Sequence, residues 1–154
     1  MPTLLHTGLT VRDLDRSLAF YRDTLGMKVA GGAENYGTEQ EHLNQVVGAR
    51  LRITALRAER GPGIEFLEYI TPPGGRAFPA DTKANDLVFW HTQLVTDDIG
   101  ALVPQLRSCG ASFVSKRVVS LPDERSAVSQ SVIVRDPDGH ALQLMQPAGA
   151  FTKN

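Results

Sequence analysis

The feature that most constrains this fold is an internal repeat. Both halves of the 154-residue chain carry a strand pattern, a helix pattern and then three more strand patterns, with a period of about 80 residues. The first half predicts strands at 4–11, 27–31, 49–55 and 64–70 and a helix at 13–25. The second half predicts strands at 89–95, 111–119, 128–135 and 141–145 and a helix from 97 or 98 to 108. The repeat therefore indicates an α+β chain of two βαβββ modules.

Helix-capping residues and a linker set the expected boundaries. Asp13 and Gly26 bracket the first helix as an N-cap and a left-handed C-cap, and Pro104 predicts a kink or a late start in the second. Residues 71–86 are rich in proline and glycine and lack periodicity, which is typical of a linker. We expect module one at about 4–70, the linker at about 71–86 and module two at about 87–147, together one domain spanning 1–154.

Composition excludes several classes of protein. The formal net charge of −1 gives no support to a nucleic-acid or polybasic membrane partner. The single Cys109 excludes an internal disulfide and any CxxC motif. No apolar run is long enough to span a bilayer, and the N-terminus lacks the basic and apolar regions of a secretory signal. We therefore expect a cytoplasmic protein whose partner is a small molecule.

Four polar side chains stand in equivalent places of the two repeats. His6 and His91 lie on the first strand of each repeat, and Glu65 and Gln143 lie on the last. Strand alternation puts each of them on the face opposite the expected helix, so the two modules could form a curved mixed sheet around a shared cavity that holds all four. Two imidazoles, a carboxylate and a carboxamide oxygen suit a divalent metal ion with positions left open.

Several motifs resemble the vicinal oxygen chelate superfamily, which includes glyoxalase I, methylmalonyl-CoA epimerase, extradiol dioxygenases, fosfomycin-resistance enzymes and bleomycin-binding proteins. They are His6 within Leu-Leu-His-Thr, the segment 13–21 with Leu25-Gly26-Met27, Ile64-Glu65-Phe66-Leu67, and Asp136-Pro137-Asp138-Gly139-His140. The resemblance covers roughly residues 4–147. It implies the paired βαβββ fold and, commonly, a homodimer whose modules are exchanged between chains or kept within one chain.

The resemblance places the family's four metal positions on His6, Glu65, His91 and Gln143. Glyoxalase I and the epimerase carry a glutamate, as ligand and base, where this chain has Gln143. A carboxamide can coordinate through its oxygen but cannot accept a proton near neutral pH. The resemblance thus implies a lyase or isomerase in which a divalent ion (Ni, Zn, Co, Mn or Fe) holds two neighbouring substrate oxygens. Glu65 would be the base, and Gln93 could support the site from behind the ligands.

Two alternatives stay open at this point. His6, His91 and Glu65 also form the two-histidine, one-carboxylate set of non-haem iron oxygenases, which keeps a dioxygenase among the candidates. Gln143 favours instead a metal-free small-ligand binder of the bleomycin-resistance type, with Tyr69, Phe89 and Trp90 as candidate liners. Of the other polar residues, Arg50 and Arg52 either hold an anionic substrate or lie on an exposed sheet face, Glu68 is solvated or paired, and His140 is expected to be exposed.

Overall fold

The computed structural model describes residues 1–121 and 127–149. The chain divides into two compact units, residues 1–76 and residues 77–154, and each unit has its own mixed sheet. Among the described residues, no helix is long and apolar enough to cross a membrane.

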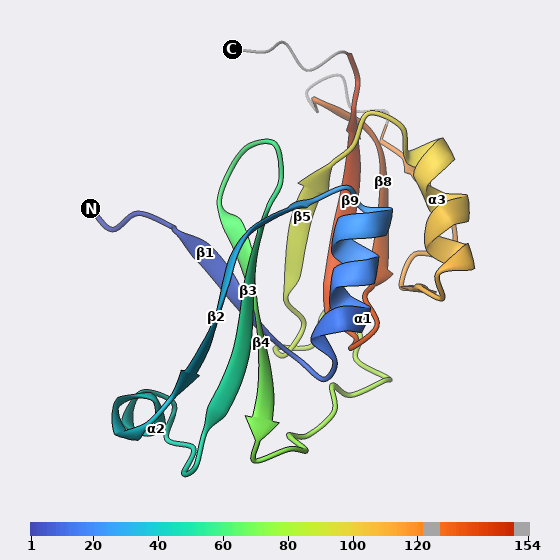
Figure 1. The fold of residues 1–154 in the computed structure, drawn as a ribbon. Coiled ribbons are helices and arrows are strands. Elements are labelled where there is room, and N and C mark those ends of the chain that lie inside the picture. Colours follow the sequence, from blue (N-terminus) through green and yellow to red (C-terminus); the bar gives the residue numbers. More distant parts are fainter. Residues whose placement is uncertain (122–126, 150–154) are drawn as a thin grey trace. The chain divides into compact units, whose positions relative to one another are not determined.

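The first unit is a four-stranded sheet with one long helical segment on it (Figure 1). Its elements are β1 His6–Val11, α1 Leu14–Leu18, the π-helical turn Ala19–Thr24 that continues α1, β2 Lys28–Tyr36, α2 Thr38–Asn44, β3 Arg50–Arg57 and β4 Gly63–Thr71. The strand order is β1-β4-β3-β2, with β1 parallel to β4 and the other pairs antiparallel. This order brings the first and last strands of the unit together.

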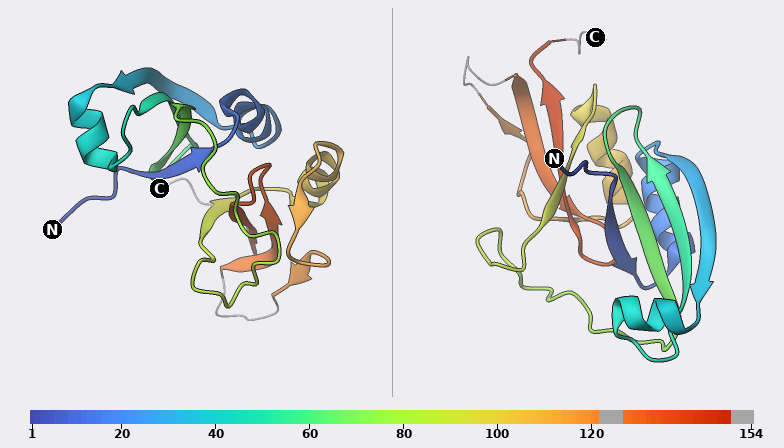
Figure 2. Two further views of the ribbon diagram at one scale, coloured as in Figure 1. Left: turned by 90° about the horizontal axis from the view of Figure 1, so that it is seen from below. Right: turned by 90° about the vertical axis from the view of Figure 1, so that its left-hand side faces the viewer.

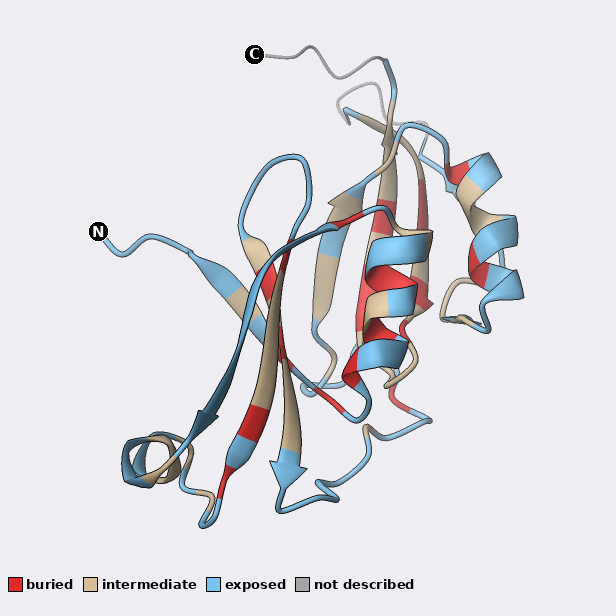
Figure 3. Ribbon diagram, viewed as in Figure 1, coloured by how far each residue is buried: buried red, intermediate tan, exposed pale blue. Residues whose placement is uncertain are grey.

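The predicted caps fix the first helix. The Asp13 carboxylate accepts a hydrogen bond from the Arg16 backbone N–H at 3.0 Å, which satisfies one free donor of the first turn. Gly26 follows the helix with φ +75°, a conformation that favours glycine. Between helix and sheet, the buried rings of Tyr21 and Phe66 meet edge to face at 4.8 Å. The core of this unit thus lies on the α1 side of the sheet (Figure 3).

The second unit repeats this plan. Its elements are β5 His91–Val95, α3 Ile99–Ser108, β6 Ser112–Phe113, β7 Val119–Ser120, β8 Val128–Arg135 and β9 Ala141–Pro147. The strand order is β5-β9-β8-β6, with β5 parallel to β9 and β7 also pairing with β8. Asp98 caps α3 by accepting from the Ala101 backbone N–H at 2.9 Å, and α3 packs on β9 (Figure 2). These elements confirm the predicted α+β fold of two βαβββ modules.

Two local predictions were wrong. The strand expected at 27–31 extends to Tyr36, because pairing with β3, continuous from Gly31 to Tyr36 after a register shift at Val29/Gly31, overrides the weak strand preference of Gly31 and Gly32. The strand expected at 111–119 is two short strands. The backbone N–H groups of Val114 and Ser115 both donate to the Ile133 carbonyl, which interrupts the ladder. The second helix begins at Ile99 after the predicted cap Asp98 and contains Pro104, so of the two expected effects of Pro104 the late start does not occur.

Candidate functional site

His6 and Glu65 lie together on the first sheet. They stand on the parallel neighbours β1 and β4, with Gly8 in register with Glu65 and His6 in register with Gly63. The His6 Nε2 atom is 3.5 Å from the Glu65 Oε2 atom, and the two side chains are 37% and 26% exposed. Ile64 and Phe66, which flank Glu65, are buried on the α1 side, so Glu65 faces away from α1 as alternation predicted.

The separation of these two groups suits two ligands of one cation. Nitrogen and oxygen ligands about 2.1 Å from the same ion lie roughly 3.0–3.4 Å apart at octahedral or tetrahedral angles. The observed 3.5 Å between His6 Nε2 and Glu65 Oε2 needs only a small adjustment to reach that range. An imidazole nitrogen and a carboxylate oxygen are both common metal ligands. This half of the predicted donor set therefore fits a divalent ion.

The residues beside Glu65 across the sheet have small side chains or none. The residues beside it across the sheet are Gly8 on β1, Ala55 on β3 and then Gly31 on β2. No side chain on this row can bond the carboxylate, and a Cβ atom at Gly8 would come within 3.3 Å of the Leu67 Cδ1 atom. The row of residues beside Glu65 therefore holds the carboxylate with no hydrogen bond.

His91 and Gln143 occupy the corresponding places in the second unit. They stand on the parallel neighbours β5 and β9, with His91 in register with Ala141 and Gln93 in register with Gln143. In both units, therefore, the histidine pairs with the residue two before the glutamate or glutamine. Leu142 and Leu144 are buried on the α3 side, so Gln143 faces away from α3. The two pairs, His6 with Glu65 and His91 with Gln143, therefore have the same strand register.

Gln143 is held from two sides, unlike Glu65. The Gln93 Nε2 atom donates to the Gln143 Oε1 atom at 3.0 Å. The Gln143 Nε2 atom donates to the Ser131 Oγ atom at 3.1 Å. Gln93 thus bonds the predicted ligand Gln143 from the neighbouring strand, on the face that sequence parity predicted. Ser131 was missed, because its bond to Gln143 depends on the β8–β9 register, which sequence alone does not give.

Within either unit, no group of three His, Cys, Asp or Glu side chains is gathered among the described residues. Each unit brings together the strands of two predicted ligands, His6 with Glu65 and His91 with Gln143. That all four bind one ion stays a prediction.

Arg50 and Arg52 of β3 are already paired. Arg52 bonds Asp15 of α1 at 2.9 Å and lies 3.3 Å from Glu68 of β4, and the hydrogen bond to Asp15 raises the pKa of Arg52. Arg50 bonds Glu34 of β2 at 2.7 Å, which raises the pKa of Arg50. Arg52 is in register with Glu68 and so lies on the α1 face, opposite Glu65. The expectation of a paired Glu68 is confirmed.

His140 was wrongly expected to be exposed. Its side chain is 18% exposed, and its Nδ1 atom lies 2.8 Å from the Oδ2 atom of the fully buried Asp136 side chain. Asp136 Oδ1 also accepts the backbone N–H groups of Asp138 and His140 at 2.9 Å. The prediction failed because strand alternation does not extend into the turn that Asp136 organises.

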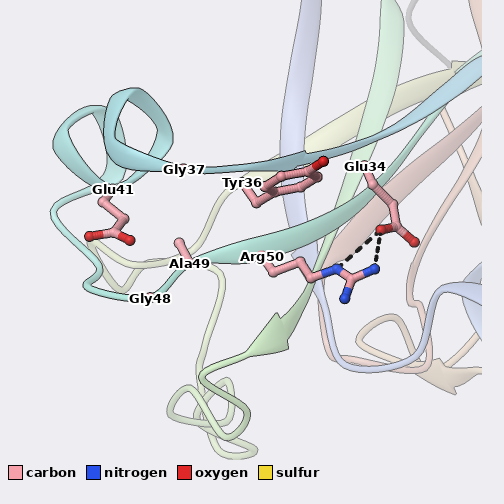
Figure 4. Close-up of a pocket in the computed structure, with 7 residues that line it drawn as sticks. All are labelled: Glu34, Tyr36, Gly37, Glu41, Gly48, Ala49 and Arg50. Carbon is pink, nitrogen blue, oxygen red and sulfur yellow. Dashed lines mark hydrogen bonds and ion pairs between the residues drawn. The ribbon is translucent and has the colours of Figure 1, made fainter.

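One cavity of about 420 Å³ lies at the α2 end of the first unit (Figure 4). Its lining residues are Glu34, Tyr36, Gly37, Glu41, Gly48, Ala49 and Arg50. The Arg50–Glu34 ion pair forms part of its wall. The cavity contains none of the four predicted metal ligands.

Comparisons with known proteins bear on the family. A family model described as Glyoxalase/Bleomycin resistance protein/Dioxygenase superfamily matches residues 3–144. An uncharacterized Bacillus subtilis protein is 29% identical over 92% of this chain and 94% of its own length. The Haemophilus influenzae lactoylglutathione lyase is 27% identical over 93% and 91%. An Actinomyces 2-epi-5-epi-valiolone epimerase is 27% identical over 94% and 80%.

The fold has close counterparts among solved structures. A glyoxalase family protein from Bacillus cereus superposes with a TM-score of 0.79, covering 97% of this chain and 96% of that one, at 19% identity. This similarity supports the fold.

Proposed function

Because the chain belongs to the glyoxalase/bleomycin resistance protein/dioxygenase superfamily, we propose that it is a divalent-metal-dependent lyase or isomerase of the glyoxalase and epimerase type. The observation that carries the proposal is the His6–Glu65 pair at 3.5 Å, repeated in register by His91 and Gln143. Relatives named as a lyase and an epimerase, each matched over more than nine-tenths of this chain, support the same class.

The proposed metal ligands are His6, Glu65, His91 and Gln143. Such an ion supplies Lewis-acid stabilisation to a pair of neighbouring oxygens on a small-molecule substrate. The ligands come from two units, so the proposed site is completed within one chain or across two. A homodimer, which the family resemblance implies, is the proposed active form.

Glu65 is the proposed base. It is the carboxylate of the ligand set, since a carboxamide at Gln143 cannot take a proton near neutral pH. Glu65 would remove the proton next to the substrate's oxygen pair and return it at the neighbouring atom, so that no net proton or electron is consumed. The small residues around Glu65 support this role, because none of them holds the carboxylate by a hydrogen bond.

The test separates binding from proton transfer. The protein is incubated with Ni, Zn, Co, Mn and Fe(II) in turn, freed of excess ion and subjected to elemental analysis. We expect about one ion per chain in the wild type, and loss of that ion in His6→Ala and Glu65→Ala. Glu68→Ala is the matched control, since Glu68 is a carboxylate of the same strand on the opposite face. Retention unaffected by the first two changes would contradict the proposal.

Proton transfer has its own readout. Glu65→Gln keeps an oxygen ligand but removes the base, so we expect the ion to be retained while solvent deuterium no longer enters the substrate. The probes are S-lactoylglutathione, suggested by the relatives' name, and simple 2-hydroxy ketones. Deuterium uptake that survives Glu65→Gln would contradict the role of Glu65.

One observation favours a second candidate, a metal-free protein that binds a small ligand. Both polar groups of the Gln143 carboxamide already have protein partners, Gln93 and Ser131. Trp90, directly before β5, is 69% exposed and offers an aromatic surface to an apolar ligand. Failure of every tested ion to bind the wild type, with a small apolar ligand quenching Trp90 fluorescence, would favour this candidate.

A further inference from the structure

We infer that Ser131 is a positioning residue that fixes the carboxamide of Gln143, so that its oxygen and not its NH₂ group faces β5, the strand that carries His91. The inference rests on the proposed function, because only the oxygen of a carboxamide is a metal ligand. A carboxamide has nearly the same shape when rotated by half a turn. Something in the protein must therefore select the orientation that can bind a cation.

Ser131 is suited to make that selection. It is a buried residue of β8, and its hydroxyl donates to the Leu144 backbone carbonyl at 3.1 Å. A carbonyl can only accept, so this bond uses the one proton of the hydroxyl. The Ser131 oxygen then offers only lone pairs to Gln143. It can accept from the Gln143 NH₂ group, as it does at 3.1 Å, but cannot donate to the Gln143 oxygen.

Gln93 adapts to the orientation of the Gln143 carboxamide and does not determine it. Its side chain is a carboxamide on an exposed residue of β5, and it can present either its oxygen or its NH₂ group to Gln143. Because Ser131 turns the Gln143 oxygen toward β5, Gln93 presents its NH₂ group at 3.0 Å. A carboxamide oxygen has two lone pairs, so one remains for a cation. The Leu144 carbonyl therefore orients the Ser131 hydroxyl, Ser131 orients the Gln143 carboxamide, and Gln143 in turn orients Gln93.

Ser129 provides a matched control. It lies two residues earlier on β8, and its hydroxyl also donates to carbonyls of β9, those of Gln146 at 3.2 Å and Pro147 at 3.1 Å. No bond joins Ser129 to Gln143 among the interactions described for the chain. Removing either hydroxyl takes away a donor to β9 carbonyls, but only Ser131→Ala frees the carboxamide.

The experiment compares Ser131→Ala, Ser131→Thr and Ser129→Ala by isothermal titration with the ion that the wild type binds best. Residues that hydrogen-bond a metal ligand typically contribute about 10–100-fold to metal affinity. We expect a loss in this range for Ser131→Ala, little change for Ser129→Ala, and recovery in Ser131→Thr, which keeps the hydroxyl. Equal losses in both alanine variants would mean a structural role only and would overturn the inference.

A second readout does not depend on metal. The Gln143 side-chain NH₂ resonances, assigned by their disappearance in Gln143→Glu, report on the bond to Ser131 in the apo-protein. We expect their exchange with water to accelerate in Ser131→Ala and not in Ser129→Ala. Unchanged exchange in Ser131→Ala would overturn the inference. If the wild type binds no ion, the proposed function fails and this exchange measurement alone decides whether Ser131 orients Gln143.

Discussion

The Gln93 side chain donates a hydrogen bond to the Gln143 oxygen at 3.0 Å, at the place where the first unit has Gly8 in register with Glu65. The pairs His6–Glu65 and His91–Gln143 thus have the same strand register but differ in the hydrogen bonds made by the last-strand residue. In the second unit Gln143 is held by Gln93 and Ser131, whereas in the first unit Gly8 offers Glu65 no hydrogen-bonding side chain. This asymmetry assigns metal holding to Gln143 and proton transfer to Glu65 in the proposed mechanism.

Gln143→Glu should bind the divalent ion more tightly, on the order of tenfold, because a charged ligand replaces a neutral one. Part of the surroundings accepts the change. Gln93 can still donate its NH₂ group to the new carboxylate, whereas the Ser131 hydroxyl, which donates to the Leu144 carbonyl, offers it no proton. Isothermal titration with Ni or Zn measures the affinity. An unchanged affinity would indicate that residue 143 is not a ligand.

Much of the fold could be predicted because its signals are local. Asp13 and Asp98 begin helices through bonds within one turn, and Gly26 follows the first helix with a positive φ, all as predicted. Alternation in 64–70 and 141–145 placed Glu65 and Gln143 on the correct faces, because one face of each strand is buried under a helix.

The remainder depends on contacts between distant segments. Arg135 donates to the carbonyls of Thr82 at 2.6 Å and Gly139 at 2.8 Å and lies 5.5 Å from the Phe89 ring. These bonds tie part of the expected linker 71–86 to the β8–β9 turn, although nothing in that segment's own composition indicates a partner. Ser131 was missed for the same reason, since a serine in an apolar strand carries no sign of which residue it will meet across the sheet.

Asp136→Asn should lower the free energy of unfolding by about 1–3 kcal/mol, because it removes a buried acceptor from a satisfied network. The carboxylate accepts two backbone N–H groups and lies 2.8 Å from His140 Nδ1. An asparagine would turn its NH₂ group toward one of these donors. Urea denaturation followed by circular dichroism measures the change. Asp97→Asn, on an exposed residue of the same unit, is the control and should leave the midpoint nearly unchanged.

Gly139→Ala should also destabilise the second unit, by roughly 1–3 kcal/mol. Gly139 has φ +101°, which an alanine adopts only with strain, and a Cβ atom there would lie 3.2 Å from the Phe78 Cβ atom. The expected result is a lower thermal midpoint. Gly149→Ala is the control, because a Cβ atom at that position meets nothing within 4 Å. Equal midpoints for the two variants would contradict the strain at Gly139.

Gly8→Gln is the most direct test of the asymmetry between the two pairs. It gives the first unit the residue that the second unit has in register, so the new NH₂ group can donate to Glu65 as Gln93 donates to Gln143. The strand accepts the side chain, because the atom that the new Cβ would approach is the flexible end of Leu67 at 3.3 Å. A carboxylate oxygen that accepts such a bond must give it up before it can take a proton at that position.

Because the new bond holds the carboxylate, Glu65 should transfer the proton more slowly in Gly8→Gln. We expect the rate at saturating metal and substrate to fall about tenfold. Gly8→Ala adds bulk without a donor and should slow the reaction much less. If both variants slow the reaction equally, the glycine beside Glu65 matters for packing alone and the proposed division of roles is wrong.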